Sequence, residues 1–338
     1  MSYKINNIVD VNILTDTLYR GAINFRAPPH IIPPPTPPSE FTLVTTGMAS
    51  YVLDAVNDVT ISNKVYYSAY GRGGNGGVRS SVNMIDWFDE LHANWQYNSL
   101  AGNTDGTVMT GNQIGEVKRK LANATNWDTV LTGDNMYAIA CDGVSTWVAG
   151  SIAGKAKLTV NNGGTWVNLP DGLNSGKTGA YIRNIYCDHN GTWIGVVDGG
   201  YAAISVDNGF SWNPLPRNLG GVVGGILQGV AGDGEGRWLI SEGGVTHRST
   251  DNGQSWAQIS TGLAGYFNQI DTTGGVWMGA YSGASAEVYS SIDTGDTWQV
   301  INLGASIAPP PTILSIYTDS FNWIIGSNKM NGWLAPQP

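Results

Sequence analysis

The sequence predicts an all-β fold: a seven-bladed β-propeller of four-stranded antiparallel blades. Four gapless copies of Ser/Thr-x-Asp/Asn-x-Gly-x-Ser/Thr-Trp have their tryptophans 46, 44 and 42 residues apart. A second series of five tryptophans runs ahead of them with nearly the same period. Short strand-like runs broken by Gly-rich turns fill each interval, and four antiparallel strands every ~40–50 residues are typical of a propeller blade. The motif tryptophans are Trp166, Trp212, Trp256 and Trp298, and those of the second series are Trp147, Trp193, Trp238, Trp277 and Trp323.

The clearest unit shows how four strands fit one period. Turns at HNG, DGG and DNGFS separate its strand-like runs, and Asn-Gly, Asp-Gly and Gly-Gly are hairpin signals. Weaker copies at 81–87 and 121–127 keep the Asn and the Trp without the glycine. Counting from about residue 49 gives six full units and a seventh that stops near its middle. The four predicted strands of the clearest unit are 183–188, 192–197, 201–206 and 212–216.

The last unit predicts how the ring closes. It supplies strands at 313–319, 322–328 and 331–335, and then the chain ends. An open blade would leave unpaired backbone donors and acceptors at its edge. The run FTLVTTG (41–47) is a suitable outer strand, so we expect it to pair with the C-terminal blade.

The segment before residue 41 differs in composition. Residues 27–40 are rich in proline, which favours an extended, semi-rigid linker. Residues 1–26 would then form an N-terminal arm, in which NNIVDVNIL (6–14) is β-branched enough to add a strand to another protein's sheet. The predicted domains are therefore an arm (1–26), a linker (27–40) and a propeller (41–338).

Composition excludes several classes of partner. With 17 basic and 26 acidic residues the net charge is −9, which disfavours nucleic acid, whose binding depends on Lys and Arg. The sequence has no run of ~18 apolar residues for a membrane span. Asp10 and Asn12 interrupt the apolar stretch that a signal peptide needs.

The repeated motif resembles the Asp-box, or BNR repeat, of sialidases, sortilin-type receptors, xyloglucan-cleaving glycosidases and photosystem-assembly propellers. In such a turn the carboxylate accepts backbone hydrogen bonds, the glycine adopts a positive φ, and the tryptophan packs against a neighbouring sheet. One copy has Asn at the acidic position, so the charge is dispensable and we predict a structural role. The structural residues are Asn161, Gly163, Trp166, Asp207, Gly209, Trp212, Asp251, Gly253, Trp256, Asp293, Gly295 and Trp298.

The sequence predicts no metal site and no cofactor. The turn carboxylates lack the several converging oxygens that Ca²⁺ needs. Cys141 and Cys187 occupy the same phase of adjacent units and are expected to be buried small residues, with a disulfide between blades left open. The histidines have no paired spacing and are expected to be solvated loop residues: His30, His92, His189 and His247.

Enzymatic alternatives rest on weaker patterns. NFRAPP (24–29) is similar to the sialidase motif that carries the first of three substrate-binding arginines, which implies Arg26, although Ala27 departs from the motif. A general glycosidase needs two carboxyls ~5–10 Å apart. Its candidates on the face opposite the motif turns are Asp171, Asp198 and Glu242, for which solvated loop acids are the simpler interpretation. We therefore predict no catalytic residue.

A binding surface on that opposite face is a simpler hypothesis than an enzyme active site. Aromatic rings beside polar side chains can stack on sugars, although the same rings can simply cap the packing of the loops. The candidate ligand-binding residues are Arg72, Trp95, Tyr97, Lys177, Tyr181, Arg217, Tyr266 and Tyr281.

The N-terminal arm favours a biological setting. NNIVDVNIL followed by LYRGAINFRAPP resembles the N-terminal arm of contractile-tail bacteriophage sheath and tail proteins. The leading hypothesis is a non-enzymatic virion component, made in the host cytoplasm without a signal peptide. Its arm would bind another virion protein, and its propeller would decorate the particle or bind a host surface glycan or surface protein. The alternatives are a sialidase-like glycoside hydrolase and an assembly-factor propeller with a protein partner.

Overall fold

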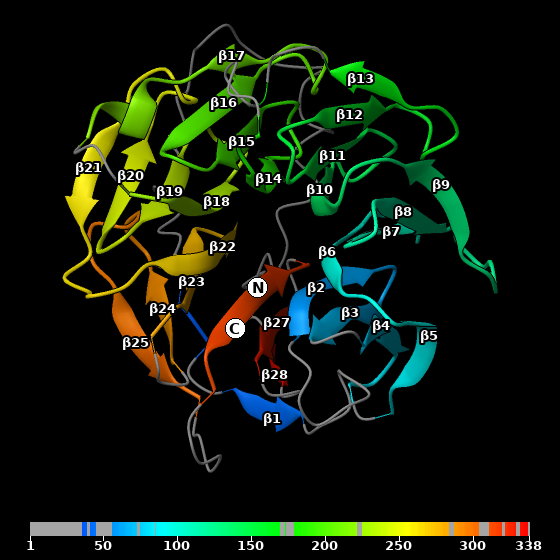
Figure 1. Ribbon diagram of the computed structural model, residues 1–338. Coiled ribbons are helices and arrows are strands. Elements are labelled where there is room, and N and C mark those ends of the chain that lie inside the picture. The colour runs from blue at the N-terminus through cyan, green and yellow to red at the C-terminus, as the bar shows by residue number, and fades with distance from the viewer. Residues whose placement is uncertain are drawn as a thin grey trace, which may run out of the picture. The chain divides into compact units, whose positions relative to one another are not determined.

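The computed structural model describes residues 36–38, 41–44, 56–72, 75–84, 86–169, 173, 179–221, 225–283, 287–303, 311–319, 322–328 and 332–336. Within these residues the strands form seven four-stranded antiparallel sheets, which follow one another around a ring (Figure 1). Each inner strand contacts the inner strand of the next blade, and the last contacts the first. The predicted seven-bladed propeller is confirmed.

The first three blades follow the chain from the inner strand outward. Blade 1 contains β2 (Val56–Ser62), β3 (Val65–Arg72), β4 (Asn75–Ser81) and β5 (Phe88–Ala93). Blade 2 contains β6 (Tyr97–Gly102), β7 (Val108–Asn112), β8 (Glu116–Lys120) and β9 (Asp128–Thr132). Blade 3 contains β10 (Met136–Cys141), β11 (Trp147–Ser151), β12 (Ala156–Thr159) and β13 (Val167–Leu169).

The next three blades repeat this order. Blade 4 contains β14 (Ile182–Cys187), β15 (Trp193–Val197), β16 (Tyr201–Ser205) and β17 (Asn213–Pro214). Blade 5 contains β18 (Leu227–Gly232), β19 (Trp238–Glu242), β20 (Val245–Ser249) and β21 (Ala257–Ser260). Blade 6 contains β22 (Phe267–Thr273), β23 (Val276–Tyr281), β24 (Glu287–Ser291) and β25 (Gln299–Asn302).

Blade 7 joins the two ends of the chain. From the inner strand outward, its first three strands are β26 (Ile313–Thr318), β27 (Asn322–Ser327) and β28 (Gly332–Pro336). The outer strand is β1 (Thr42–Val44), which pairs with β28 in the register Thr42↔Leu334 and Val44↔Gly332. The predicted closure by the N-terminal strand is therefore observed over residues 42–44.

The predicted arm and linker lie outside the described residues except for residues 36–38. The compact unit that holds the propeller runs from Pro35 to Pro338. Among the described residues the single helical element is the short 3-10 turn η2 (Arg217–Gly220). No helix in this part of the chain is long and apolar enough to cross a membrane.

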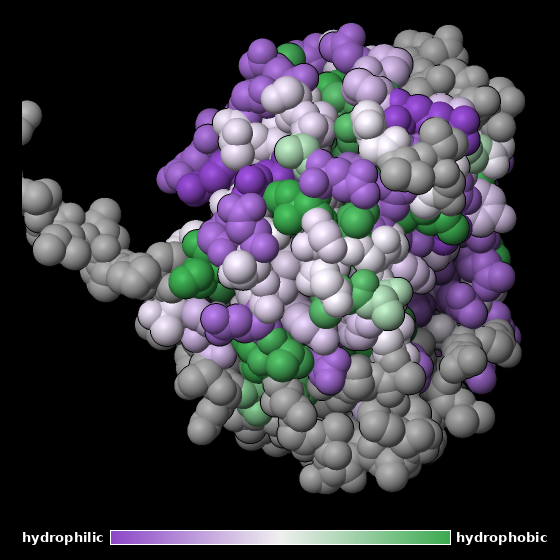
Figure 2. Space-filling view, turned by 90° about the vertical axis from the view of Figure 1, so that its left-hand side faces the viewer, coloured by the Kyte–Doolittle hydropathy of each residue, from purple (hydrophilic) through white to green (hydrophobic). Residues whose placement is uncertain are grey.

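The core lies between the blades. The second strands run through the middle of sheets that are covered on both faces, and β11 and β15 are buried at every residue. The five tryptophans of the second series lie at the first residue of β11, β15 and β19 and at the second residue of β23 and β27, and all five side chains are fully buried. The outer strands face solvent: β21 is mostly exposed. Figure 2 shows the side of the ring that carries β21 and β25, where hydrophobic residues form separate spots among polar ones.

The motif turns, which we call the repeat turns (159–166, 205–212, 249–256 and 291–298), link the third and fourth strands. In blade 4, Asp207 Oδ1 accepts hydrogen bonds from the Ser211 amide (2.8 Å) and the Ser205 hydroxyl (2.8 Å). The Gly209 amide, in a residue with φ of 86°, donates to Ser205 Oγ. Trp212 is buried against the cluster that joins blades 3 and 4. Each such turn is therefore fixed by its own polar residues and packs against its neighbour.

The repeat turns also tie adjacent blades together. The Asn208 amide group accepts from the Trp193 indole (2.9 Å) and donates to Asp142 and Thr146 of blade 3. These contacts lie at the repeat-turn face, where the first and second strands also connect. Because β1 runs antiparallel to β28, Thr42 begins at this same face.

Two expectations on single residues need revision. His247 is fully buried in β20, with Nε2 2.6 Å from Glu242 Oε2, so the solvated-loop interpretation is wrong for this histidine. Glu242 is itself buried at the end of β19 and accepts from Asn218 (3.0 Å), so it is not a solvated loop acid. Cys141 and Cys187 are buried and free, with no disulfide between them.

Candidate functional site in the central channel

Every inner strand is irregular at the same place, one residue after its first pairing with the second strand. The pairing skips a residue there, for example between Val56 and Asp58 and between Tyr97 and Ser99. A bulge redirects a side chain and locally bends its strand. In blade 5 the irregularity spans Gln228 and Gly229. The residues at this position, here called the bulge residues, are Asn57, Asn98, Tyr137, Arg183, Gln228, Asn268 and Leu314.

All seven bulge residues line a cavity of about 310 Å³ in the central channel. Three of them are asparagines that bridge to the next blade. Asn57 donates to the Tyr97 carbonyl (2.8 Å), Asn98 to the Met136 carbonyl (2.9 Å) and Asn268 to the Ile313 carbonyl (2.7 Å). In each case the acceptor directly precedes the next bulge residue. These asparagines therefore serve as links between blades.

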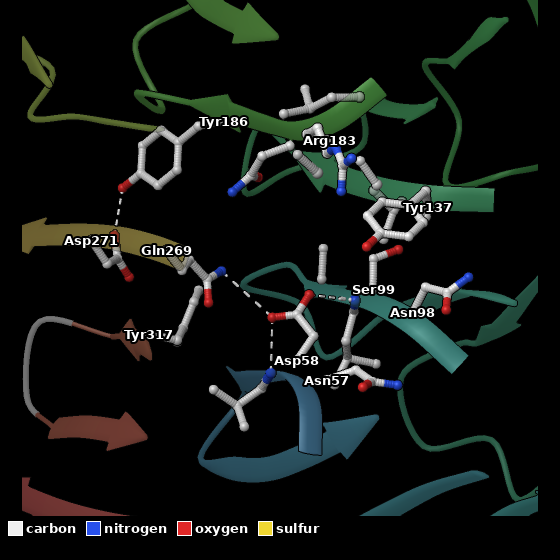
Figure 3. A pocket seen from close by; sticks show the side chains of 18 of the residues that line it. Asn57, Asp58, Asn98, Ser99, Tyr137, Arg183, Tyr186, Gln269, Asp271 and Tyr317 are labelled. Carbon is white, nitrogen blue, oxygen red and sulfur yellow. Dashed lines mark hydrogen bonds between the residues drawn. The ribbon is translucent and has the colours of Figure 1, made fainter. Parts of the chain in front are cut away.

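Blades 3 and 4 replace this link by an aromatic and cationic group. The Arg183 guanidinium lies 5.9 Å from the ring centroid of Tyr137 and 5.5 Å from that of Tyr181. Arg183 Nε donates to Asp198 Oδ1 at 2.5 Å. Although burial acts in the opposite direction, the hydrogen bond and charge of Asp198 raise the pKa of Arg183. The arginine therefore stays charged and is held by these partners at the bulge end of the channel (Figure 3).

The opposite side of the channel holds two carboxyl groups. Asp58 accepts from the amides of Val59 (2.9 Å) and Leu100 (2.8 Å), and Gln269 Nε2 lies 3.5 Å from its Oδ1. Asp271 accepts from the Tyr186 hydroxyl (2.7 Å) and from the amides of Thr318 and Thr272. Figure 3 shows Tyr186 reaching Asp271 from β14 to β22, past the intervening blade. Both carboxyl groups thus connect strands that are distant in sequence.

These carboxyl groups are hard to ionise. Burial raises the pKa of Asp58 to about 7, against the opposing effect of its hydrogen bonds from Leu100 and Val59. Burial likewise raises the pKa of Asp271 to about 6, against hydrogen bonds from Tyr186, Thr318 and Thr272. Shifted carboxyl pKa values in a cavity are typical of functional sites, but structural networks produce them too.

The side chains that line the cavity from the inner strands of blades 2 and 3 are small. Where blades 1 and 6 present Asp58, Gln269 and Asp271, blades 2 and 3 present Ser99, Ala101, Ala138 and Ala140, all of which line the cavity. A polar ligand of the size of one sugar ring fits a space of this order.

The structure distributes the predicted ligand-binding residues over several environments. Tyr181 (39% exposed) contacts Arg183 at the bulge end of the channel. Tyr97 is only 2% exposed, because it begins an inner strand and packs between blades 1 and 2, so it lies in the core and not on a loop surface. Trp95 is half-buried against the same cluster.

The remaining candidates do not converge on the channel. Arg217 lies over the Tyr201 ring (5.2 Å) and donates to the Gly199 carbonyl. Tyr281 packs edge-on against Tyr289 (5.2 Å). Tyr266 is 36% exposed near Ser282. The Lys177 residue and the Arg72 side chain lie outside what the structure describes, as do Arg26 and Asp171 of the enzymatic alternatives.

Sequence reasoning missed most of the channel residues. The bulge residue lies nine or ten positions before a tryptophan of the second series in blades 3 to 7, which is the signal that could have located it. Its identity changes from blade to blade, so no motif marked it. Among the described residues, no group of three or more His, Cys, Asp or Glu side chains is arranged to hold a metal ion.

Comparison with known proteins supports the fold. No protein-family model matches the sequence, and no curated protein matches it. Among solved structures it resembles YCF48 from Cyanidioschyzon merolae (15% identity, TM-score 0.66), covering 87% of this chain and 98% of that one. It also resembles the WD40 propeller domain of Doa1 (15% identity, TM-score 0.65; 87% and 96% covered).

A third similar structure is an enzyme, the GH74 xyloglucanase from Xanthomonas campestris (15% identity, TM-score 0.66). The match covers 86% of this chain but only 53% of that one, so this chain spans about half of the enzyme. At these identities the similarity establishes a β-propeller and nothing about activity. Similar structures thus include both a xyloglucanase and YCF48 bound to a D1 peptide.

Proposed function

We propose that this propeller is a non-enzymatic, carbohydrate-binding component of a virion, attached to another virion protein through residues 1–26. The observation that carries the binding function is the group of Tyr137, Arg183 and Tyr181 at the bulge end of a cavity of about 310 Å³. Tyrosine rings offer flat apolar faces to a sugar ring, and the guanidinium and asparagine groups beside them offer hydrogen bonds to its hydroxyls.

The way the acids are bound favours recognition over catalysis. A glycosidase needs one carboxyl that gives up its proton to the leaving group and a second that attacks or activates water. Asp198 is held by Arg183, and Glu242 is held by Asn218 and His247. Asp58 and Asp271 each accept two backbone amides. These four carboxyls have structural partners.

The position of β1 suits an anchored particle component. Residues 1–26 precede β1, and β1 begins at the repeat-turn face. The bulge residues lie at the opposite ends of the inner strands, because each inner strand starts with its bulge. The start of β1 and the bulge end of the channel therefore lie at opposite faces of the propeller.

A glycan array probed with the full chain tests the binding function. We expect selective binding, and we expect Tyr181→Ala to weaken it at least tenfold, since this exposed ring can be removed without opening the core. Tyr266→Ala is the matched control, because its ring is similarly exposed but is not one of the rings over which Arg183 lies. Equal losses in both variants, or no glycan bound at all, would contradict the proposal.

The hydrolase alternative has one observation in its favour, the raised pKa values of Asp58 and Asp271 in one cavity. Sugar release from polysaccharides or sialosides that is lost in Asp271→Asn would support it.

For the virion setting, the test is incorporation into particles. A chain without residues 1–40 that is incorporated as well as the full chain would refute the anchor.

A further inference from the structure

The inner strands present backbone amides to the channel, because the edge of each inner strand that faces the channel has no neighbouring strand. In three cases a side chain from the preceding blade accepts from such an amide. Asp58 accepts from Leu100 (2.8 Å), Gln269 from Ile316 (2.9 Å) and Asp271 from Thr318 (2.8 Å). Leu100 and Ile316 are the second residues after the bulge, and Thr318 is the fourth. The channel edge thus has a repeated hydrogen-bonding pattern.

The inner strands of blades 3 and 4 have backbone amides at the same positions, but the preceding blades supply no side-chain acceptor for them. The register places Ile139 and Ile185 second after the bulge, as Leu100 is in blade 2. The acceptor would have to come from Ser99 for Ile139 and from Ala138 for Ile185. Ser99 Oγ makes no hydrogen bond, and alanine has no polar atom. Within the described residues, no side-chain acceptor meets either amide.

The next amides along these strands repeat the situation. Cys141 and Cys187 are fourth after the bulge, the position at which Thr318 is bonded to Asp271. The preceding blades present Ala101 and Ala140 there. The four small residues therefore leave a row of backbone donors without side-chain acceptors along the cavity lining.

The lack of a side chain has a different cause between blades 5 and 6. Gly229 takes the acceptor position there, but a Cβ at Gly229 would lie 2.9 Å from the backbone of Gln269. The two strands approach so closely that no side chain fits between them. In blades 2 to 4, by contrast, the small side chains border open space.

The charge around this space favours a neutral ligand. Among the described residues that line the cavity, Arg183 is the one arginine, and its charge is neutralised by the ion pair with Asp198. Asp58 and Asp271 lie across the channel and would repel an anion when ionised. The hydroxyls of a sugar suit this lining. It combines the backbone amides of the inner strands of blades 3 and 4 with the side-chain amides of Asn184 and Gln228 and the ring of Tyr137.

We propose that the part of the channel between blades 2 and 4 is a slot for the terminal neutral hexose of a glycan, whose hydroxyls accept hydrogen bonds from the Ile139 and Ile185 amides. This inference rests on the proposed carbohydrate-binding function and specifies its ligand and its donors. The small residues Ser99, Ala101, Ala138 and Ala140 determine that the slot is open.

Filling the slot tests the inference with one side chain, at a residue that is 4% exposed in the cluster joining blades 3 and 4. In Ala138→Asn the new side chain takes the position that Gln269 has in blade 6, so it should accept from the Ile185 amide and occupy the slot. We expect a melting temperature equal to or above that of the parent chain and at least tenfold weaker binding of methyl glycosides of glucose, galactose, mannose or N-acetylglucosamine. Ala257→Asn, on exposed β21, is the matched control and should bind normally.

The outcomes separate this inference from the proposed function. If the parent chain binds glycans and Ala138→Asn binds them equally well, the slot is refuted and the carbohydrate-binding function stands. If the parent chain binds no glycan, the proposed function itself fails. Binding of N-acetylneuraminic acid or methyl glucuronide in place of the neutral sugars would refute the ligand class.

A second measurement does not depend on the variant folding. In the ¹⁵N-labelled full chain, titration with the bound methyl glycoside should shift the Ile139 and Ile185 amide resonances more than those of Leu100 and Ile316, which already have protein acceptors. Unchanged resonances at Ile139 and Ile185 would overturn the inference.

Discussion

The carboxylate of Asp207 has the same role in blade 4 as the side-chain amide of Asn161 has in blade 3. Each Oδ1 accepts from the amide four residues later and from the hydroxyl two residues earlier, at 2.8–2.9 Å. The difference lies at the other side-chain atom: Asp207 accepts from the Ser211 hydroxyl, while Asn161 donates to that of Thr165. Either polarity works because a hydroxyl both donates and accepts.

This equivalence makes the charge at residue 207 unimportant and the Oδ1 acceptor essential. We expect Asp207→Asn to leave the free energy of unfolding almost unchanged. Asp207→Ala should lower it by about 1–3 kcal/mol, because it removes the hydrogen bonds from the Ser205 hydroxyl, the Ser211 amide and the Ser211 hydroxyl. Equilibrium unfolding in urea measures both. A loss in Asp207→Asn as large as in Asp207→Ala would show that the charge itself stabilises the turn.

The acids of this protein also predict how its stability depends on pH. Burial raises the pKa of Asp58 to about 7 and that of Asp271 to about 6, from an ordinary value of 3.8. The folded state therefore holds protons that the unfolded state has released, and this stabilisation is lost as the pH rises from about 4 through 7. The hydrogen bonds of Ser255 and Ser249 lower the pKa of Asp251 to about 2, which acts in the opposite direction below about pH 4.

The melting temperature should accordingly be highest near pH 4, fall as the pH rises to about 7 and change little above that. Calorimetry from about pH 4 to 8, with Asp58→Asn as the comparison, checks the assignment. The variant keeps an acceptor for the Leu100 amide but cannot ionise, so its melting temperature should fall less between about pH 4 and 7. A parallel decline in both proteins would assign the effect to other groups.

At the scale of the elements, the second strand and the repeat turn of each blade are joined through an indole. Trp147, Trp193 and Trp238 donate to the asparagine that precedes the motif glycine, at 2.9, 2.9 and 3.2 Å. These asparagines adopt a positive φ of 51–58°, which asparagine tolerates well. In blade 6 the position is Thr294, also with a positive φ (54°), and the buried Trp277 indole nitrogen has no hydrogen-bond partner among the described residues.

Thr294→Asn should therefore stabilise the protein. It removes a β-branched residue from the left-handed region and supplies the acceptor that Trp277 lacks, each worth about 1 kcal/mol. We expect a melting temperature higher by a few degrees in thermal unfolding. The reverse change, Asn208→Thr, should lower it, and the prediction fails if both substitutions destabilise.

The same scale shows what the sequence could predict. The repeat turns were predictable because the residue types of Asp207, Gly209 and Trp212 recur at equivalent positions of other blades. The conformation of a turn depends on such residue types. The bulge residues were not, because a bulge depends on backbone geometry and accepts Asn, Tyr, Arg or Leu. Tyr97 and His247 were misplaced for a related reason: both lie near turns in sequence, but the alternation of their strands directs their side chains into the core.

The candidate site was the least predictable part. Its cavity exists because Ser99, Ala101, Ala138 and Ala140 are small, and a missing side chain leaves no positive pattern in one sequence. Only Tyr181 of the predicted ligand-binding residues lies beside it. Ring closure was predictable because backbone pairing must be satisfied at an edge, whatever side chains the strands carry.

At the scale of the whole molecule, the ring depends on one short non-local pairing. β1 contributes three residues to blade 7, and it pairs with β28, about 290 residues later. Phe41 packs beside it on the cluster that joins blades 6 and 7. Because each blade buries its faces only against its neighbours, loosening blade 7 exposes surfaces of blades 6 and 1 as well.

Truncation on either side of β1 tests this dependence. Removing residues 1–34 keeps Phe41 and β1, so we expect the urea midpoint of the full chain and a monomer in size-exclusion chromatography. Removing residues 1–44 exposes the edge of β28 and should lower the free energy of unfolding by several kcal/mol and promote self-association, since an open edge pairs with other chains. Equal midpoints for the two truncated chains would mean that blade 7 holds the ring closed with three strands, and that the pairing of β1 with β28 adds little to the stability of the propeller.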